Sequence, residues 1–144
     1  MITITGRVSW FGGPHDKGVR PSEGLSIFQS VRQCPDIFLA TQPRGTSGLC
    51  RRLDPEKLYV AMRWPHSVTY AFLAHHLVKA EANGKSVLLQ PADWGPALRT
   101  RRVADLSPGA MRRLGLETDQ VATFHIPEPG DQPFVDESPD DPEV

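Results

Sequence analysis

The dipeptide Asn83-Gly84 places the strongest constraint on the fold of this chain. Asparagine followed by glycine provides the two positive-φ residues of a type I′ turn. The turn separates residues 77 to 82 from residues 85 to 90, and both stretches have the length and apolar content of short strands. The sequence therefore predicts a tight antiparallel hairpin whose second strand leads to Asp93, just before a Gly-Pro turn.

The remaining elements are predicted to be short. The 144 residues include 14 prolines and 12 glycines, which favour many turns and short strands over a helical bundle. Strands are expected at residues 2 to 11, 36 to 41, 58 to 64 and 120 to 126. A helical pattern covers residues 66 to 78, and a second helix is expected from the N-cap Ser107 to Gly115. This length suits a single β-rich domain with its own core.

The charges divide the chain into two parts. Residues 127 to 144 hold seven of the 17 acidic residues, five prolines and no lysine or arginine. Such a segment buries too little apolar surface to offset its ordering entropy, so a disordered acidic tail is expected. Residues 1 to 126 keep all 16 basic residues against 10 acidic ones, a net charge of +6. That charge favours anionic partners such as nucleic acid, a phosphate-rich surface or a cell-wall polymer.

Cys34 and Cys50 are the only cysteines, and neither belongs to a cluster with zinc-like spacing. No metal site and no cofactor are therefore expected, and a disulfide and two free thiols remain equal alternatives. The first residues lack the charged start and apolar stretch of a secretory signal, and no segment reaches transmembrane length. We expect synthesis in the cytoplasm without a signal peptide, and no membrane partner.

Two carboxylates are candidate functional groups. Asp93 and Asp105 each lie at the edge of a predicted element, with arginines between them. A carboxylate that is fixed beside a turn meets the geometric requirement of general acid/base catalysis. The alternative is that Asp93 forms a turn and Asp105 precedes a helix for structural reasons, and spacing alone favours that alternative.

Several segments, taken in order, are similar to a known family. They are Val8-Ser9-Trp10-Phe11-Gly12, Ser22-Glu23-Gly24, the Asn83-Gly84 hairpin, Asp93-Trp94-Gly95-Pro96 and Arg102-Val103-Ala104-Asp105-Leu106-Ser107. The chain resembles the double-psi β-barrel of the rare lipoprotein A-like family, most closely over residues 77 to 126. The resemblance implies a mainly β domain at residues 1 to 126, a six-stranded double-psi β-barrel with an open groove and one or two short helices. It also implies an insertion around residues 29 to 76, and the tail follows at residues 127 to 144.

The resemblance also implies candidate catalytic residues. Asp93 and Asp105 match aspartates that matter for function in family relatives. Glu23 lies where active members place an acidic residue, although the neighbouring glycine is on its other side here. The family's histidine has two candidates, His66 and His75, and neither aligns with it directly.

Candidate substrate-binding residues surround these carboxylates in the sequence. Trp94 replaces the family's arginine and offers a stacking face to a sugar ring, whereas Trp10 and Trp64 are expected in the core. A group of arginines is expected to hold substrate carboxylates or to keep one aspartate ionised, with a solvated basic face as the alternative. The group consists of Arg99, Arg101 and Arg102.

The resemblance leaves more than one function open, because the family and its structural relatives include lytic transglycosylases, glycoside hydrolases and non-cleaving expansins. The leading hypothesis is a peptidoglycan-cleaving lytic transglycosylase from a phage or prophage. Such a protein would be carried in the virion or released to the periplasm at lysis. Its expected partners are peptidoglycan glycan strands and other virion proteins. The residues around Glu23 match the family poorly, and no histidine of this chain aligns with the family's histidine. Both points favour the alternative, a non-catalytic wall-binding or structural virion protein. Nucleic-acid binding has only bulk charge in its support and is not favoured.

Overall fold

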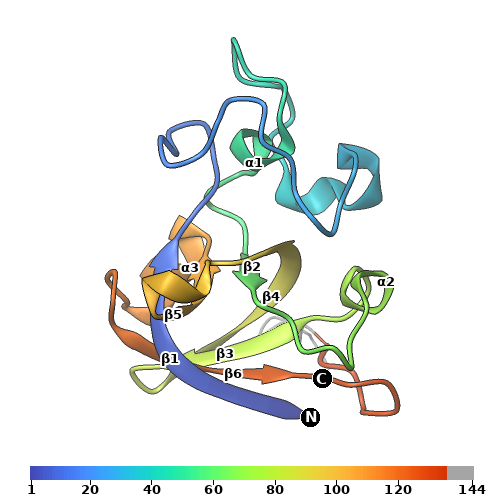
Figure 1. Cartoon of the computed structure of the whole chain (residues 1–144), viewed down its shortest axis with the longest axis vertical. Helices are drawn as coiled ribbons and strands as arrows, with labels where there is room; N and C mark the ends of the chain where they lie inside the picture. The colour runs from blue at the N-terminus through green and yellow to red at the C-terminus, as the bar shows by residue number, and fades with distance from the viewer. Residues whose placement is uncertain (136–144) are drawn as a thin grey trace, which may run out of the picture.

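The computed structural model describes residues 1 to 135, which form a closed barrel of six strands with three short α-helices (Figure 1). The strands are β1 (Ile2–Trp10), β2 (Tyr59–Met62), β3 (Val78–Ala82), β4 (Lys85–Trp94), β5 (Arg102–Leu106) and β6 (Val121–Ile126). Around the barrel they follow the order β1, β5, β2, β4, β3, β6. The six-stranded barrel expected from the sequence is therefore confirmed.

The order around the barrel differs from the order along the chain because two of the pairs are parallel. β1 pairs in parallel with β5, and β2 with β4, while the other four pairs are antiparallel. A parallel pair cannot be joined by a tight turn and needs a long crossover. As a result β5, β2 and β4, which are far apart in sequence, lie side by side in the barrel wall.

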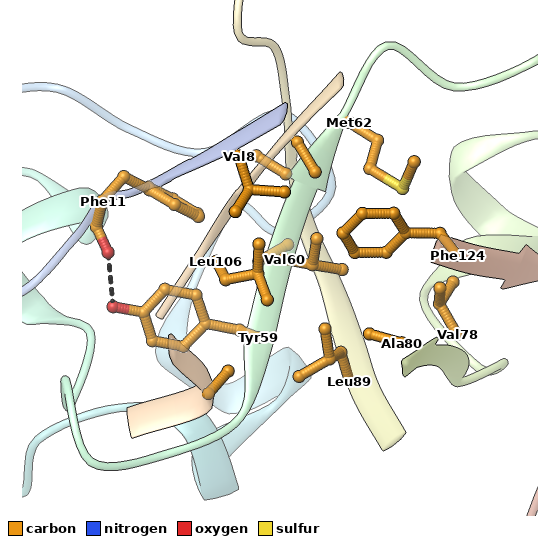
Figure 2. Close-up of a cluster of buried hydrophobic side chains, with 14 of the residues drawn as sticks. Val8, Phe11, Tyr59, Val60, Met62, Val78, Ala80, Leu89, Leu106 and Phe124 are labelled. Atoms are coloured by element: carbon orange, nitrogen blue, oxygen red, sulfur yellow. Dashed lines mark hydrogen bonds between the residues drawn. The ribbon is translucent and has the colours of Figure 1, made fainter. Parts of the chain in front are cut away.

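The barrel is filled by side chains that alternate along its strands. In β6, every second residue is buried and the residues between them reach solvent, the pattern of a sheet with one buried face. Figure 2 shows Val8, Val60, Leu89 and Phe124 converging from four different strands, and none of them is exposed. Burial of such side chains is the main source of stability of the barrel.

Residues 11 to 58 form a long, irregular segment that joins β1 to β2 and lies over one end of the barrel (Figure 1). It contains the 3-10 turns η1 (Val31–Gln33) and η2 (Pro35–Ile37) and the helix α1 (Leu49–Arg52). The hydroxyl of Tyr59 donates a 2.8 Å hydrogen bond to the carbonyl of Phe11 and fixes the start of this segment (Figure 2).

One expectation for this region is wrong. The strand expected at residues 36 to 41 is absent, because Pro35 begins η2 and only Phe38 makes an isolated bridge, with Leu53. The insertion expected around residues 29 to 76 stays a prediction, and that range contains β2, one of the six strands of the barrel.

The hairpin and the helix after β5 form as predicted. Asn83 and Gly84 have φ values of 54° and 72°, as a type I′ turn requires. Helix α3 (Pro108–Leu114) starts at Ser107, whose hydroxyl accepts a hydrogen bond from the Ala110 N–H at 3.1 Å. The side-chain amide of Asn83 also donates to the carbonyl of Leu114 at 2.8 Å, so the hairpin turn caps the end of α3.

The other helical expectation needs correction. Helix α2 covers only Tyr70–Leu73 of the residues 66 to 78, because Val78 already belongs to β3. With α1 included, the described part of the chain has three short α-helices where one or two were expected.

The beginning of the acidic tail contacts the barrel. The amino terminus of Met1 pairs with Glu128 at 2.9 Å and with Asp131 at 2.6 Å. Residues 127 to 135 contain no helix or strand, and residues 136 to 144, the rest of the expected disordered tail, lie outside the described residues.

Candidate active site

Two of the candidate carboxylates lie in one row across the barrel wall. Ala61 on β2 pairs with Asp93 on β4 and, on its other side, with Asp105 on β5. Asp105 in turn pairs with Ser9 on β1. Residues that pair directly share one face of a sheet, so Asp93 and Asp105 flank the small side chain of Ala61. Their Cα atoms are separated by two strand spacings, roughly 10 Å.

An irregularity in β4 brings Asp93 into this row. Val60 pairs with Pro91, but the next residue, Ala61, pairs with Asp93, so Ala92 is the extra residue of a bulge. Without the extra residue, Ala61 would pair with Ala92, and Asp93 would lie one position beyond the row. The bulge therefore determines where this carboxylate lies.

The carboxylate of Asp93 is held by backbone N–H groups. It accepts hydrogen bonds from Ser26 and Trp94, both at 2.9 Å. Burial raises the pKa of Asp93, and these hydrogen bonds act in the opposite direction because they stabilise the ionised form. The indole N–H of Trp64 donates to the Asp93 carbonyl at 2.8 Å, so both the backbone and the side chain of this residue are fixed.

The carboxyl of Asp105 has a different environment. It is half-buried and accepts no hydrogen bond from any other residue between 1 and 135. Burial raises the pKa of Asp105 to about 6, with Arg102 opposing the shift and the charges of Asp16 and Asp93 adding to it. One carboxyl of the row is therefore held by donors, while the other keeps its proton up to near-neutral pH. Such a difference between two neighbouring carboxyls is typical of an acid/base pair.

Asp16 is a further carboxylate near the row that sequence reasoning missed. It is buried and accepts hydrogen bonds from the N–H groups of Gly12 at 2.7 Å and Gly18 at 2.9 Å. Arg51 donates to the carbonyl of Asp16 at 3.0 Å and to that of Val19 at 2.7 Å. Asp16 thus organises the loop after β1. An aspartate set between glycines two and four residues away is a turn signal that could have identified it.

Glu23 belongs to the long segment, residues 11 to 58, that lies over the end of the barrel (Figure 1). Its side chain is exposed, and its carbonyl accepts a hydrogen bond from the Cys50 N–H at 3.0 Å. Burial raises the pKa of the Cys50 thiol, and the charges of Asp16, Asp93 and Glu23 add to the shift. The structure therefore brings Glu23 into the neighbourhood of the other carboxylates, although no hydrogen bond joins its side chain to them.

The histidine candidates are not joined to the carboxylates. His66 is exposed in the turn after Trp64, and His75 is exposed just after α2. Neither side chain makes a hydrogen bond or an ion pair with another residue in the described range. The indole of Trp64, which precedes this turn, makes the hydrogen bond to Asp93.

Of the predicted binding residues, three have exposed side chains and one, Arg102, already pairs with a carboxylate. Trp94 is 48% exposed, and Arg99 and Arg101 are exposed in and just after η3 (Leu98–Thr100). Arg102, however, donates two hydrogen bonds to Asp119, at 2.8 and 3.2 Å, which raises the pKa of the arginine. Its charge still reaches Asp105, but its guanidinium already has a carboxylate partner.

Arg63 is a second residue that sequence reasoning passed over. Its guanidinium donates to the carbonyls of Pro96 at 2.6 Å and Arg102 at 2.9 Å. These bonds join the end of β2 to both ends of the turn between β4 and β5. Arg63 therefore holds the segment that carries Arg99 and Arg101. No local sequence pattern signals this role, because both acceptors are distant backbone carbonyls.

Metal ligands, cysteines and helix lengths were compared over the part of the chain that the structure describes. Within residues 1 to 135, no three His, Cys, Asp or Glu side chains are arranged to hold a metal ion. Both cysteines are free thiols, Cys50 buried and Cys34 half-buried. None of the helices in the described range is long and apolar enough to cross a bilayer.

Comparison with known proteins does not assign a family to this site. A scan against protein-family models gives no match, and a search of curated proteins finds no similar sequence.

Proposed function

We propose that this protein cleaves glycosidic bonds of peptidoglycan, with Asp105 as the acid/base group. The observation that carries the proposal is the half-buried Asp105 carboxyl, which accepts no hydrogen bond within residues 1 to 135 and lies in one row with the hydrogen-bonded carboxylate of Asp93. A carboxyl that stays protonated near neutral pH can donate a proton, and a neighbouring ionised carboxylate stabilises positive charge.

In the proposed reaction, Asp105 donates its proton to the glycosidic oxygen as the bond between that oxygen and the anomeric carbon breaks. The oxocarbenium-like sugar that results is stabilised by the charge of Asp93. A hydroxyl of the same sugar then attacks the anomeric carbon, and the carboxylate of Asp105 takes the hydroxyl proton. The products are an anhydro sugar and a new chain end, and the carboxyl of Asp105 is protonated again.

The two aspartates lie on either side of Ala61, with Cα atoms roughly 10 Å apart across β2. This arrangement leaves room for a sugar hydroxyl or a water molecule as the nucleophile, so the reaction products decide between them.

The surface next to the row supports binding of a glycan with anionic substituents. Trp94 follows Asp93 directly and presents an indole that is 48% exposed. Exposed aromatic side chains combine an apolar face with a polar edge and suit the mixed surface of a sugar. Arg99 and Arg101 are available for carboxylates on the substrate. Delivery in a virion or at host lysis remains part of this proposal.

A second candidate function is glycan binding without cleavage, alone or as part of a virion. Two observations favour it: Arg102 is already paired with Asp119, and His66 contacts neither carboxylate. A barrel of this kind would retain Trp94 and the basic residues as a binding surface.

Incubation with purified sacculi separates the two functions. Soluble products are analysed by mass spectrometry, and protein in the pellet is measured in parallel. Cleavage predicts anhydro-muropeptides from the wild-type protein and from the control Asp36→Asn, an exposed acid in η2, and none from Asp105→Asn. Pelleting without any released fragments would support the binding function. Hydrolysed, non-anhydro ends would mean that water is the nucleophile.

A further inference from the structure

A second concave surface lies beside the row of carboxylates. It is a cavity of about 540 Å³ between the end of β1, the loop after it and helix α3. Its apolar walls are Trp10, Pro55, Pro108, Met111 and Leu116. The volume and the apolar lining are within the usual range for small-molecule sites.

The exposure of Trp10 follows from the course of the chain. Sequence reasoning placed Trp10 in the core, but 44% of it is exposed, whereas Trp64 is buried as expected. β1 ends at Trp10, and the chain then turns away through Gly12 and Gly13, which have φ values of 88° and 95°. The turn leaves the indole on the cavity wall, which the buried side chains of Met111 and Leu116 also line.

The charges around the cavity are mainly negative. The lining includes the acids Asp16, Glu56 and Glu117, one arginine, Arg112, and one histidine, His15. Arg112 already forms an ion pair with Glu56, whereas Glu117 makes no ion pair within residues 1 to 135. Asp105, whose charge interacts with that of Asp16, adds to the negative potential. An acidic, apolar-walled cavity favours ligands that carry a positive charge.

We propose that this cavity binds a ligand with an apolar or aromatic body and an amine group. The apolar walls take up the body of the ligand, and the amine lies near Glu117 and Asp16. The exposed face of Trp10 attracts the same cation through its ring quadrupole. This site is separate from the glycan-cleaving function and does not depend on it.

Three ligands with the same ring test the charge preference. Naphthylmethylamine, naphthylmethanol and naphthylacetate are titrated into the full-length protein, and chemical shift changes in its amide spectrum give dissociation constants. The amine is expected to bind at least about fivefold more tightly than the alcohol, and the carboxylate more weakly than both. The shifted resonances should come from the residues around Trp10 and Met111. Equal affinities, tighter binding of the carboxylate, shifts elsewhere or no binding would overturn the proposal.

Substitutions distinguish binding in this cavity from non-specific attraction of a cation to the protein surface. Glu117→Gln changes an exposed side chain and is expected to weaken amine binding about two- to fivefold with no effect on the alcohol. Trp10→Ala is expected to weaken all three ligands, because it removes one apolar wall. The matched control Asp36→Asn, which removes an exposed acid away from the cavity, should change nothing. An equal loss in Glu117→Gln and Asp36→Asn would refute the site.

Discussion

Replacement of Asp105 by asparagine should stabilise the protein at neutral and higher pH. The folded state holds the pKa of Asp105 at about 6, about two units above its ordinary value of 3.8. Below about pH 4 the group is protonated in both the folded and the unfolded states, so its ionisation costs no stability there. Between about pH 4 and pH 6 the unfolded chain ionises first, and stability is lost as the pH rises.

The magnitude of the stability difference follows from the pKa shift of Asp105. Two pKa units correspond to about 3 kcal/mol of differential interaction, which is the upper limit of the loss above about pH 7. Asparagine has nearly the same shape but no charge, so Asp105→Asn avoids this loss. The variant should therefore match the wild type near pH 4 and exceed its free energy of unfolding by about 2 to 3 kcal/mol near pH 8.

Urea unfolding at a series of pH values measures this difference. The control Asp36→Asn changes an exposed acid and should follow the wild-type curve throughout. A stability difference that does not change with pH would refute the reasoning, as would an Asp105→Asn variant that is less stable than the wild type near pH 8. Either result would mean that the folded state supports the charge of Asp105.

Three further substitutions test the packing around the site, each by urea unfolding. Asp93→Ala should cost about 1 to 3 kcal/mol, because two backbone N–H groups lose their acceptor, and an unchanged stability would show that water replaces it. Gly48→Ala should destabilise the long segment, because the new Cβ would overlap the backbone of Glu23; a variant as stable as the wild type would contradict this close approach. Tyr59→Phe should cost about 1 kcal/mol through loss of the hydrogen bond to Phe11, and a stabilised variant would argue against that bond.

Local signals were sufficient for the elements whose conformation is determined by neighbouring residues. The Asn83-Gly84 turn depends on two residues that tolerate positive φ, and its geometry is as predicted. Helix α3 depends on a serine cap and a terminal Gly115, whose φ is 66°. Together these elements predicted that Asp93 lies at a strand end and that Asp105 lies just before a helix, whereas the strand β5 that carries Asp105 was not predicted.

Features that depend on contacts between residues far apart in the sequence could not be predicted from local signals. The bulge at Ala92 exists only in relation to β2, thirty residues earlier, and it decides the position of Asp93. The exposure of Trp10 results from the turn that follows β1, whereas a tryptophan in a short strand is more often buried. The expected strand at residues 36 to 41 failed because Pro35 favours the start of a helical turn.

The most direct test of the central claim is the rate at which the protein releases anhydro-muropeptides from sacculi, measured as a function of pH. If Asp105 is the acid, the wild-type rate should fall as the pH rises above about 6, because the carboxyl must be protonated to act. Asp105→Asn should be at least about 100-fold slower below pH 6 and should lack the decline above it, while Asp36→Asn keeps the wild-type profile. Wild-type activity in a folded Asp105→Asn variant, or a rate that rises through this pH range, would contradict the assignment.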